Sequence, residues 1–196
     1  MPGPITHLAY AERYLRKNPS RDLKKFILGT IFPDIRYIAK IERDLTHKKF
    51  RPDLNLSAID SFKAGWKLHI YLDSQWNKIV KTSRFYCPGN KDNLLVWTAA
   101  KIIEDRIDRK KISDLAKYWR IIKNPGSGSV LHISKDKIKL YYQANANYLI
   151  RGDYEAFVKY IFQESSINPM LVKTEELEKD KKMVEFLSKI LDKITP

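Results

Sequence analysis

Hydrophobic residues recur along most of this chain at spacings of three and four, with polar residues between them. This period places the apolar side chains on one face of an α-helix. No stretch alternates between apolar and polar residues at length, as a half-buried strand would. The pattern predicts an all-α protein, a single multi-helix domain over residues 1–196, with helices at about 5–17, 20–29, 35–41, 57–82, 92–108, 113–123, 135–150, 153–163 and 174–194.

Proline, glycine and small polar residues separate these segments. Residues 31–34, Ile-Phe-Pro-Asp, are typical of a turn, because a proline disfavours the helical conformation in the residue before it. Residues 46–56 are expected to form a loop. Ser57, Asp92 and Ser113 suit the N-cap position of the helices that follow them, since a short polar side chain accepts from the first free backbone amides.

The predicted helix over 57–82 has an unusual apolar face. The opposite face carries Asp60 and four lysines, so the apolar face is expected to be buried. That face is formed by Phe62, Trp66, His69, Asp73, Trp76 and Val80.

His69 and Asp73 therefore lie one turn apart between two tryptophans. Burying an ionised aspartate without a partner costs several kcal/mol. Two arrangements remove that cost. The two side chains form a hydrogen bond with each other, or a metal ion takes both as ligands.

Three further residues favour the metal. The chain has only four histidines, and three of them lie in its first 70 residues. His7 follows Pro-Ile-Thr, His47 follows Leu-Thr, and Asp34 ends the Ile-Phe-Pro-Asp turn. Histidine and carboxylate ligands without cysteine suit Zn²⁺, with Mn²⁺ or Fe²⁺ as alternatives. We therefore predict a metal site of one or two ions formed by these three residues with His69 and Asp73.

The charge indicates the kind of partner. Lysine and arginine number 37 against 23 acidic residues, which gives a net charge of +14. A basic surface concentrates anions, so we expect an anionic phosphate-ester substrate, with an anionic membrane surface as a second candidate partner. Nucleic acid suits the charge but is not favoured, because the chain lacks a recognisable base-stacking motif. The alternative is a lysine-rich surface that has no dedicated partner.

Cys87 is the only cysteine, so we expect neither an internal disulfide nor a cysteine-based zinc site. No apolar run reaches the roughly 18–20 residues that span a bilayer, and no N-terminal stretch has the pattern of a secretory signal. We expect a protein without a transmembrane segment, cytoplasmic by default, with export by a route that needs no such signal as the alternative.

The order of the candidate ligands resembles that of the zinc-dependent phospholipase C family. The chain has His7, a Phe-x-x-Gly-x-x-x-Pro-Asp segment ending at Asp34, Thr-His at His47, and His69-x-x-x-Asp73 followed three residues later by a tryptophan. The family is all-helical, shares its fold with fungal single-strand nucleases and includes short members of about this length.

The resemblance implies a division of these ligands between ions. Asp34, His47, His69 and Asp73 would surround one zinc ion. His7 would hold a second, with Asp73 bridging the two.

The resemblance runs from about residue 4 to about residue 108, and its last part departs from the family pattern. The large enzymes carry more histidines there, with a His-x-x-x-Glu motif, whereas this chain has Ala-Lys-Ile-Ile-Glu ending at Glu104. Glu104 and Asp108 lie one helical turn apart and are candidate metal ligands. The alternative is a solvent-facing charge pattern in which Asp105 pairs with a neighbouring lysine and arginine. A site of one or two metals is expected in place of three zinc ions.

The implied function is a hydrolase of phosphoric esters. Two metals about 3.5–4 Å apart would clamp a phosphate and lower the pKa of a bridging water toward 7. Asp34 is the candidate catalytic carboxylate, as a metal ligand or by orienting that water. One alternative is a non-catalytic helical protein with a structural or decayed metal site, and another is a nuclease on the same fold. His132 stands alone in Val-Leu-His-Ile and is more typical of a structural or surface residue.

Overall fold

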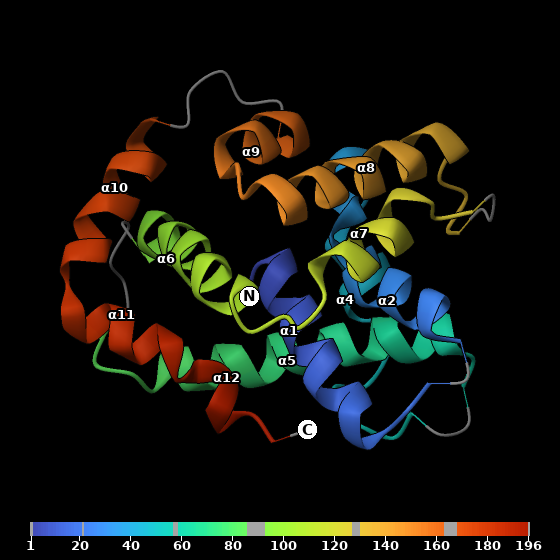
Figure 1. Ribbon diagram of the computed structural model, residues 1–196, viewed down its shortest axis with the longest axis horizontal. Helices are drawn as coiled ribbons and strands as arrows, with labels where there is room; N and C mark the ends of the chain where they lie inside the picture. The colour runs from blue at the N-terminus through green and yellow to red at the C-terminus, as the bar shows by residue number, and fades with distance from the viewer. Residues whose placement is uncertain are drawn as a thin grey trace.

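The computed structural model describes residues 2–20, 22–56, 59–85, 93–126, 130–162 and 168–195. Every regular element in these ranges is a helix, so the all-α prediction is confirmed (Figure 1). The elements are α1 (Pro4–Lys17), α2 (Leu23–Ile31), the 3₁₀ helix η1 (Phe32–Ile35), α3 (Arg36–Ala39), α4 (Arg43–His47), α5 (Ser61–Lys81), α6 (Asn93–Arg109), α7 (Leu115–Lys123), α8 (Lys135–Arg151), α9 (Tyr154–Phe162), α10 (Asn168–Lys179), α11 (Lys181–Ser188) and α12 (Ile190–Lys193).

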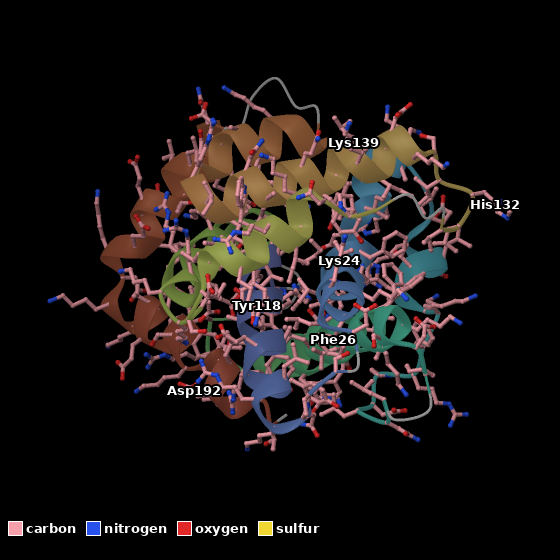
Figure 2. All side chains as sticks on the ribbon, turned by 45° about the vertical axis from the view of Figure 1, so that its right-hand side comes forward. Lys24, Phe26, Tyr118, His132, Lys139 and Asp192 are labelled. Atoms are coloured by element: carbon pink, nitrogen blue, oxygen red, sulfur yellow. The ribbon has the colours of Figure 1, made fainter. Side chains whose placement is uncertain are left out.

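The helices surround one continuous hydrophobic core. In Figure 1, α1 lies near the centre, where it packs on α2, α5 and α6. The C-terminal helices α10 and α11 cover the outer side of α6, and α7 to α9 form the opposite part of the molecule. Phe26 and Tyr118 lie in the interior, whereas Lys24, Lys139 and Asp192 are exposed (Figure 2).

Helices α2 and α5 pack most closely, and two glycines make this possible. A Cβ at Gly29 would overlap the carbonyl oxygen of Phe62, and a Cβ at Gly65 would overlap that of Phe26. The two backbones are therefore in direct contact, which a side chain at either position would prevent. This contact fixes the position of α2 along α5, close to His69.

The predicted face of α5 is buried as expected, with Trp66, His69, Asp73 and Trp76 inside. The helix begins later than predicted, at Ser61. Its start is fixed by the carboxylate of Asp60, which accepts from the backbone amides of residues 62 and 63.

The three N-caps predicted from the sequence are not observed in the described structure. Ser57 and Asp92 lie outside the described residues. Ser113 does not cap α7, because the carboxylate of Asp114 accepts from the backbone amide of Lys117 instead.

Three element predictions were wrong. Residues 32–35 form the 3₁₀ helix η1 in place of the predicted turn, and Phe32 keeps a helical conformation although a proline follows it. His47 does not lie in a loop, since it is the last residue of the short helix α4. The single helix predicted over 174–194 is divided into α10, α11 and α12. The first division has a local cause, because the carboxylate of Asp180 accepts from the backbone amides of Lys182 and Met183 and so caps a new helix.

Within the described part of the chain, none of the helices has the length and apolarity required to cross a membrane.

Candidate metal centre

Five predicted ligands from four elements converge at one place in the core. His7 comes from α1, Asp34 from η1, His47 from the end of α4, and His69 and Asp73 from α5. The side chains are almost fully buried except that of Asp34, which is 19% exposed. Residues far apart in the sequence thus form one compact group of imidazoles and carboxylates.

The distances within this group are too long for hydrogen bonds. Asp73 Oδ1 lies 3.4 Å from His7 Nε2, and Asp73 Oδ2 lies 3.5 Å from His47 Nε2 and 3.8 Å from His69 Nε2. Hydrogen bonds between nitrogen and oxygen measure about 2.7–3.2 Å. The expected alternative, a direct hydrogen bond between His69 and Asp73, is therefore not formed.

The same distances suit ligands around a metal ion. A tetrahedral zinc ion with Zn–N bonds of about 2.0–2.1 Å separates its ligand atoms by about 3.3 Å. The fourth short distance, 3.5 Å from His47 Nε2 to Asp34 Oδ1, falls in the same range. The group therefore has the spacing of a ligand shell.

The three imidazole rings are held with Nε2 directed into the group. His7 Nδ1 lies 2.8 Å from the carbonyl oxygen of Gly3, and His69 Nδ1 lies 2.8 Å from that of Thr30. A carbonyl oxygen can only accept, so each Nδ1 must carry a hydrogen and donate it. In the neutral ring, Nε2 then keeps its lone pair for a metal.

His47 is oriented by a hydroxyl group in place of a carbonyl. The Thr46 hydroxyl donates to the carbonyl oxygen of Arg43 and lies 2.8 Å from His47 Nδ1. Because its only hydrogen is directed to Arg43, the hydroxyl oxygen accepts from Nδ1. The Trp66 indole donates to the Thr46 carbonyl oxygen at 2.6 Å and fixes this end of α4.

Six buried atoms of the group have no hydrogen-bond partner within the described structure. An unpaired buried polar atom typically costs about 1–3 kcal/mol. One or two cations among them would satisfy all six, which is the fit expected of a metal site. They are Nε2 of His7, His47 and His69, Oδ1 of Asp34, and both carboxylate oxygens of Asp73.

The electrostatics favour the protonation states that bind metal. Burial opposes ionisation of Asp34 and Asp73, but the neighbouring histidines outweigh it. They lower the pKa of Asp34 and hold that of Asp73 at about 2. Burial, together with His7, lowers the pKa of His69 to about 3. At neutral pH the group therefore contains ionised carboxylates and a neutral His69, the forms that ligate metals.

The ligand atoms fall into two sets. One set is His7, His69 and Asp73, and the other is Asp34, His47 and His69, with all atoms of each set within 4.8 Å of one another. Each set taken by itself offers three protein ligands, but His69 belongs to both, and its Nε2 can ligate only one ion. A zinc ion held by three protein ligands keeps its fourth position open, as catalytic zinc sites do.

The predicted carboxylates of α6 do not join this group. Glu104 and Asp108 are absent from both sets. The alternative prediction, a solvent-facing charge pattern, was wrong, because Glu104, Asp105 and Asp108 are all fully buried. The sequence pattern of a charged residue at every third or fourth position is the same for an exposed helix face and for a face that other helices cover.

Each buried α6 carboxylate has a partner of its own. Trp76 donates its indole N–H to Glu104 at 2.9 Å, and Lys111 lies 2.8 Å from Asp108. Asp105 accepts from the backbone amide and the hydroxyl of Thr6, and from the hydroxyl of Tyr148. Asp105 thus holds α1 in place next to His7, a role that its sequence context did not indicate.

His132 lies on the outside of the molecule. It is exposed, and it projects from the segment before α8 at the edge of Figure 2. The structure does not bring it to the other three histidines.

Two hollows reach the group from outside. A small one of about 50 Å³ touches Asp34 and is lined by Tyr37, Lys101 and Asn145 among others. A wider one of about 550 Å³ touches His47 and Asp73. Three of the five ligand residues therefore border a hollow, although their ligand atoms are buried, and a purely structural metal site does not require such hollows.

Comparison with known proteins gave no match, whether with family models, with curated proteins or with solved structures.

Proposed function

We propose that this protein is a metal-dependent phosphoesterase with a centre of two ions, for which zinc is the best-suited metal. The observation that carries the proposal is the set of six unpartnered, buried ligand atoms directed at one another. Buried polar atoms without partners are rare in folded proteins, and six in one place call for a cation.

Asp73 supports a two-ion arrangement. Its Oδ1 faces His7, whereas its Oδ2 faces His47 and His69. A carboxylate whose two oxygens face separate sets of ligands suits a bridging role. His7 would then be the second protein ligand of one ion, and Asp34 would join His47 and His69 around the other.

An enzyme is favoured over a structural site by access and by ligand number. Two hollows border the ligand residues Asp34, His47 and Asp73, and the six ligand atoms are too few to fill the four positions of each of two tetrahedral ions. When bound, two ions would orient a phosphate ester and supply an acidified water that attacks phosphorus. The part-exposed Asp34 is the carboxylate best placed to ligate metal or to orient that water.

The basic surface supports an anionic substrate. The net charge of +14 raises the local concentration of phosphate esters and similar anions. Phosphate monoesters and diesters, including phospholipids, are therefore the substrate class to test first.

The first experiment measures metal content by elemental analysis on protein purified without a metal-affinity tag. We compare the natural protein with His69→Ala, and with His132→Ala as a matched control that removes an exposed histidine. One or two equivalents of zinc, lost only in His69→Ala, are expected. Hydrolysis of bis(p-nitrophenyl) phosphate and of dispersed phospholipid is then assayed, and it should be lost in the same variant.

Two results would contradict the proposal. Absence of bound metal, with no uptake of added zinc, manganese or iron, would exclude a metal centre. Stoichiometric metal without hydrolysis of any phosphate monoester or diester would instead indicate a structural site.

A further inference from the structure

The wider hollow beside the metal centre is unusually basic. Arg43, Lys48, Lys49 and Arg51 line it together with Phe50, and His47 and Asp73 form its inner end. We call this hollow the basic basin. Four cationic residues therefore line a space that also borders two of the proposed metal-ligand residues.

Acidic residues in and near the basin neutralise it only in part. Asp73 is the one acidic residue that lines it, and its carboxylate belongs to the metal centre, where Arg43 lies 3.6 Å away. Lys48 forms an exposed ion pair with Asp44, which does not line the basin. Within the described residues, Lys49 and Arg51 form no ion pair.

Arg51 also has an acidic neighbour, and that neighbour is already occupied. Asp53 is close enough to Arg51 for the guanidinium to contribute to lowering the pKa of Asp53, but the main cause is Lys67, which forms an ion pair with it. The basin thus keeps a net positive charge after the surrounding acids are counted.

The two hollows differ in size, and this difference favours the basin as the place for a large substrate. A buried water needs about 10–15 Å³ of such space, so the cavity of about 50 Å³ at Asp34 holds only a few waters or a single small group. The basic basin of about 550 Å³ is as large as typical ligand sites. The basin therefore has room for a part of the substrate beyond the reacting phosphate, which the small cavity lacks.

We propose that the basic basin binds a second phosphate group of the substrate, separate from the phosphate that reacts. The proposal rests on the proposed function, and it names the preferred substrates as esters that carry at least one additional phosphate. Arginine and lysine form charge-assisted hydrogen bonds with phosphate oxygens. Lys48, Lys49 and Arg51 are the binding residues, and they do not touch the reacting phosphate.

The test uses the metal-loaded full chain and two matched pairs of compounds. Phosphatidylinositol is compared with phosphatidylinositol 4,5-bisphosphate in mixed micelles, and glycerophosphoinositol with its 4,5-bisphosphate in solution. We expect kcat/KM to be at least tenfold higher for the bisphosphate of at least one pair. A preference in the micelle pair alone indicates that the second phosphate belongs to a lipid head group. A preference in the soluble pair indicates that it belongs to a free phosphate ester.

The basin variant combines Lys48→Ser, Lys49→Ser and Arg51→Ser. We expect its KM for the preferred bisphosphate to rise about tenfold, since three exposed charge contacts together have about that effect, while kcat is retained. The control combines Lys135→Ser, Lys137→Ser and Lys139→Ser on α8. These three lysines are exposed and line neither hollow, so the control loses the same charge elsewhere.

Calorimetric binding of glycerophosphoinositol 4,5-bisphosphate separates this proposal from the proposed function. Without any hydrolysis, tighter binding of the bisphosphate that is weakened only in the basin variant would still support the basin as a phosphate site. Equal binding of both members of each pair would overturn it. Equal weakening in the basin and control variants would also overturn it, because net charge alone would then explain the effect.

Discussion

The orientation of each histidine depends on one atom outside the ligand group. For His7 and His69 this atom is a backbone carbonyl oxygen, which substitution cannot remove. For His47 it is the hydroxyl of Thr46. Thr46 is therefore the position where the role of ring orientation can be tested directly.

Thr46→Val replaces the hydroxyl by a methyl group of similar size and leaves His47 Nδ1 without an acceptor. We expect metal affinity to fall about 10- to 100-fold, the usual effect of losing a partner behind a metal-ligating histidine. Competition with a chromophoric chelator measures the change. Thr82→Val is the control, because the exposed Thr82 hydroxyl donates only to backbone oxygens of its own helix. Unchanged affinity in Thr46→Val would show that the hydroxyl does not position the ring.

The limits of the metal centre are tested by two amide substitutions. Asp73→Asn removes a charge from the centre and should abolish stoichiometric zinc. Glu104→Gln should retain the metal, because burial and the nearby Asp108 raise the pKa of Glu104 well above its ordinary value, so a neutral amide resembles the protonated acid. Elemental analysis of both variants decides the point. Loss of metal in Glu104→Gln would extend the centre to α6.

At the scale of elements, the contact between α2 and α5 connects packing to the site. Thr30 follows Gly29 on α2, and its carbonyl oxygen holds His69 of α5. The close approach at Gly65 brings α5 against the backbone of Phe26 and Thr30. The position of the His69 ring therefore depends on the distance between two helix backbones.

Gly65→Ala should destabilise the protein although alanine favours a helix by about 1 kcal/mol over glycine. The added Cβ would overlap backbone atoms that cannot move independently, and we expect a net loss of about 3 kcal/mol, at the upper end for overpacked cores. Denaturant unfolding measures the loss, and chelator competition should show weaker zinc binding. A variant as stable as the natural protein, with unchanged zinc affinity, would contradict the direct contact of the two backbones.

At the scale of the whole molecule, the buried acids of α6 make stability depend on pH. Burial raises the pKa of Asp105 from 3.8 to about 7, although Thr6 and Tyr148 donate hydrogen bonds to it. Between about pH 4 and pH 7 the native state keeps a proton that the unfolded chain has released. The contribution of protonated Asp105 to the free energy of unfolding is therefore fully present below about pH 4 and is lost as the pH rises to about 7. Above that pH the free energy of unfolding no longer changes because of this residue.

Asp105→Asn keeps the shape of the side chain and removes the titration. As the pH is raised from 4 to 7, the free energy of unfolding of the variant should increase by a few kcal/mol relative to that of the natural protein, since each pKa unit corresponds to about 1.4 kcal/mol. Unfolding free energies measured across this range with equal metal loading test the expectation. Asp136→Asn, an exposed control, should leave the slope unchanged. A difference between Asp105→Asn and the natural protein that does not vary with pH would contradict a raised pKa.

Local spacing in the sequence was enough for the helical class and for the inward face of α5. Helical period is a property of neighbouring residues, so the positions of Trp66, His69 and Asp73 on one face follow from their spacing alone. The choice of His7, Asp34 and His47 as partners also came from the sequence. The structure brings all five together, and their binding of a metal remains a prediction.

Only the tertiary structure decided what surrounds these residues. Elements that are distant in sequence determine the distances among the ligand atoms and the basic basin. The same holds for the carbonyl oxygen that His69 contacts through Nδ1. The buried state of Asp105 is the clearest case, because its partners Thr6 and Tyr148 lie 99 and 43 residues away. Sequence spacing records which side chains share a helix face, whereas burial and pairing are fixed by which other helix covers that face.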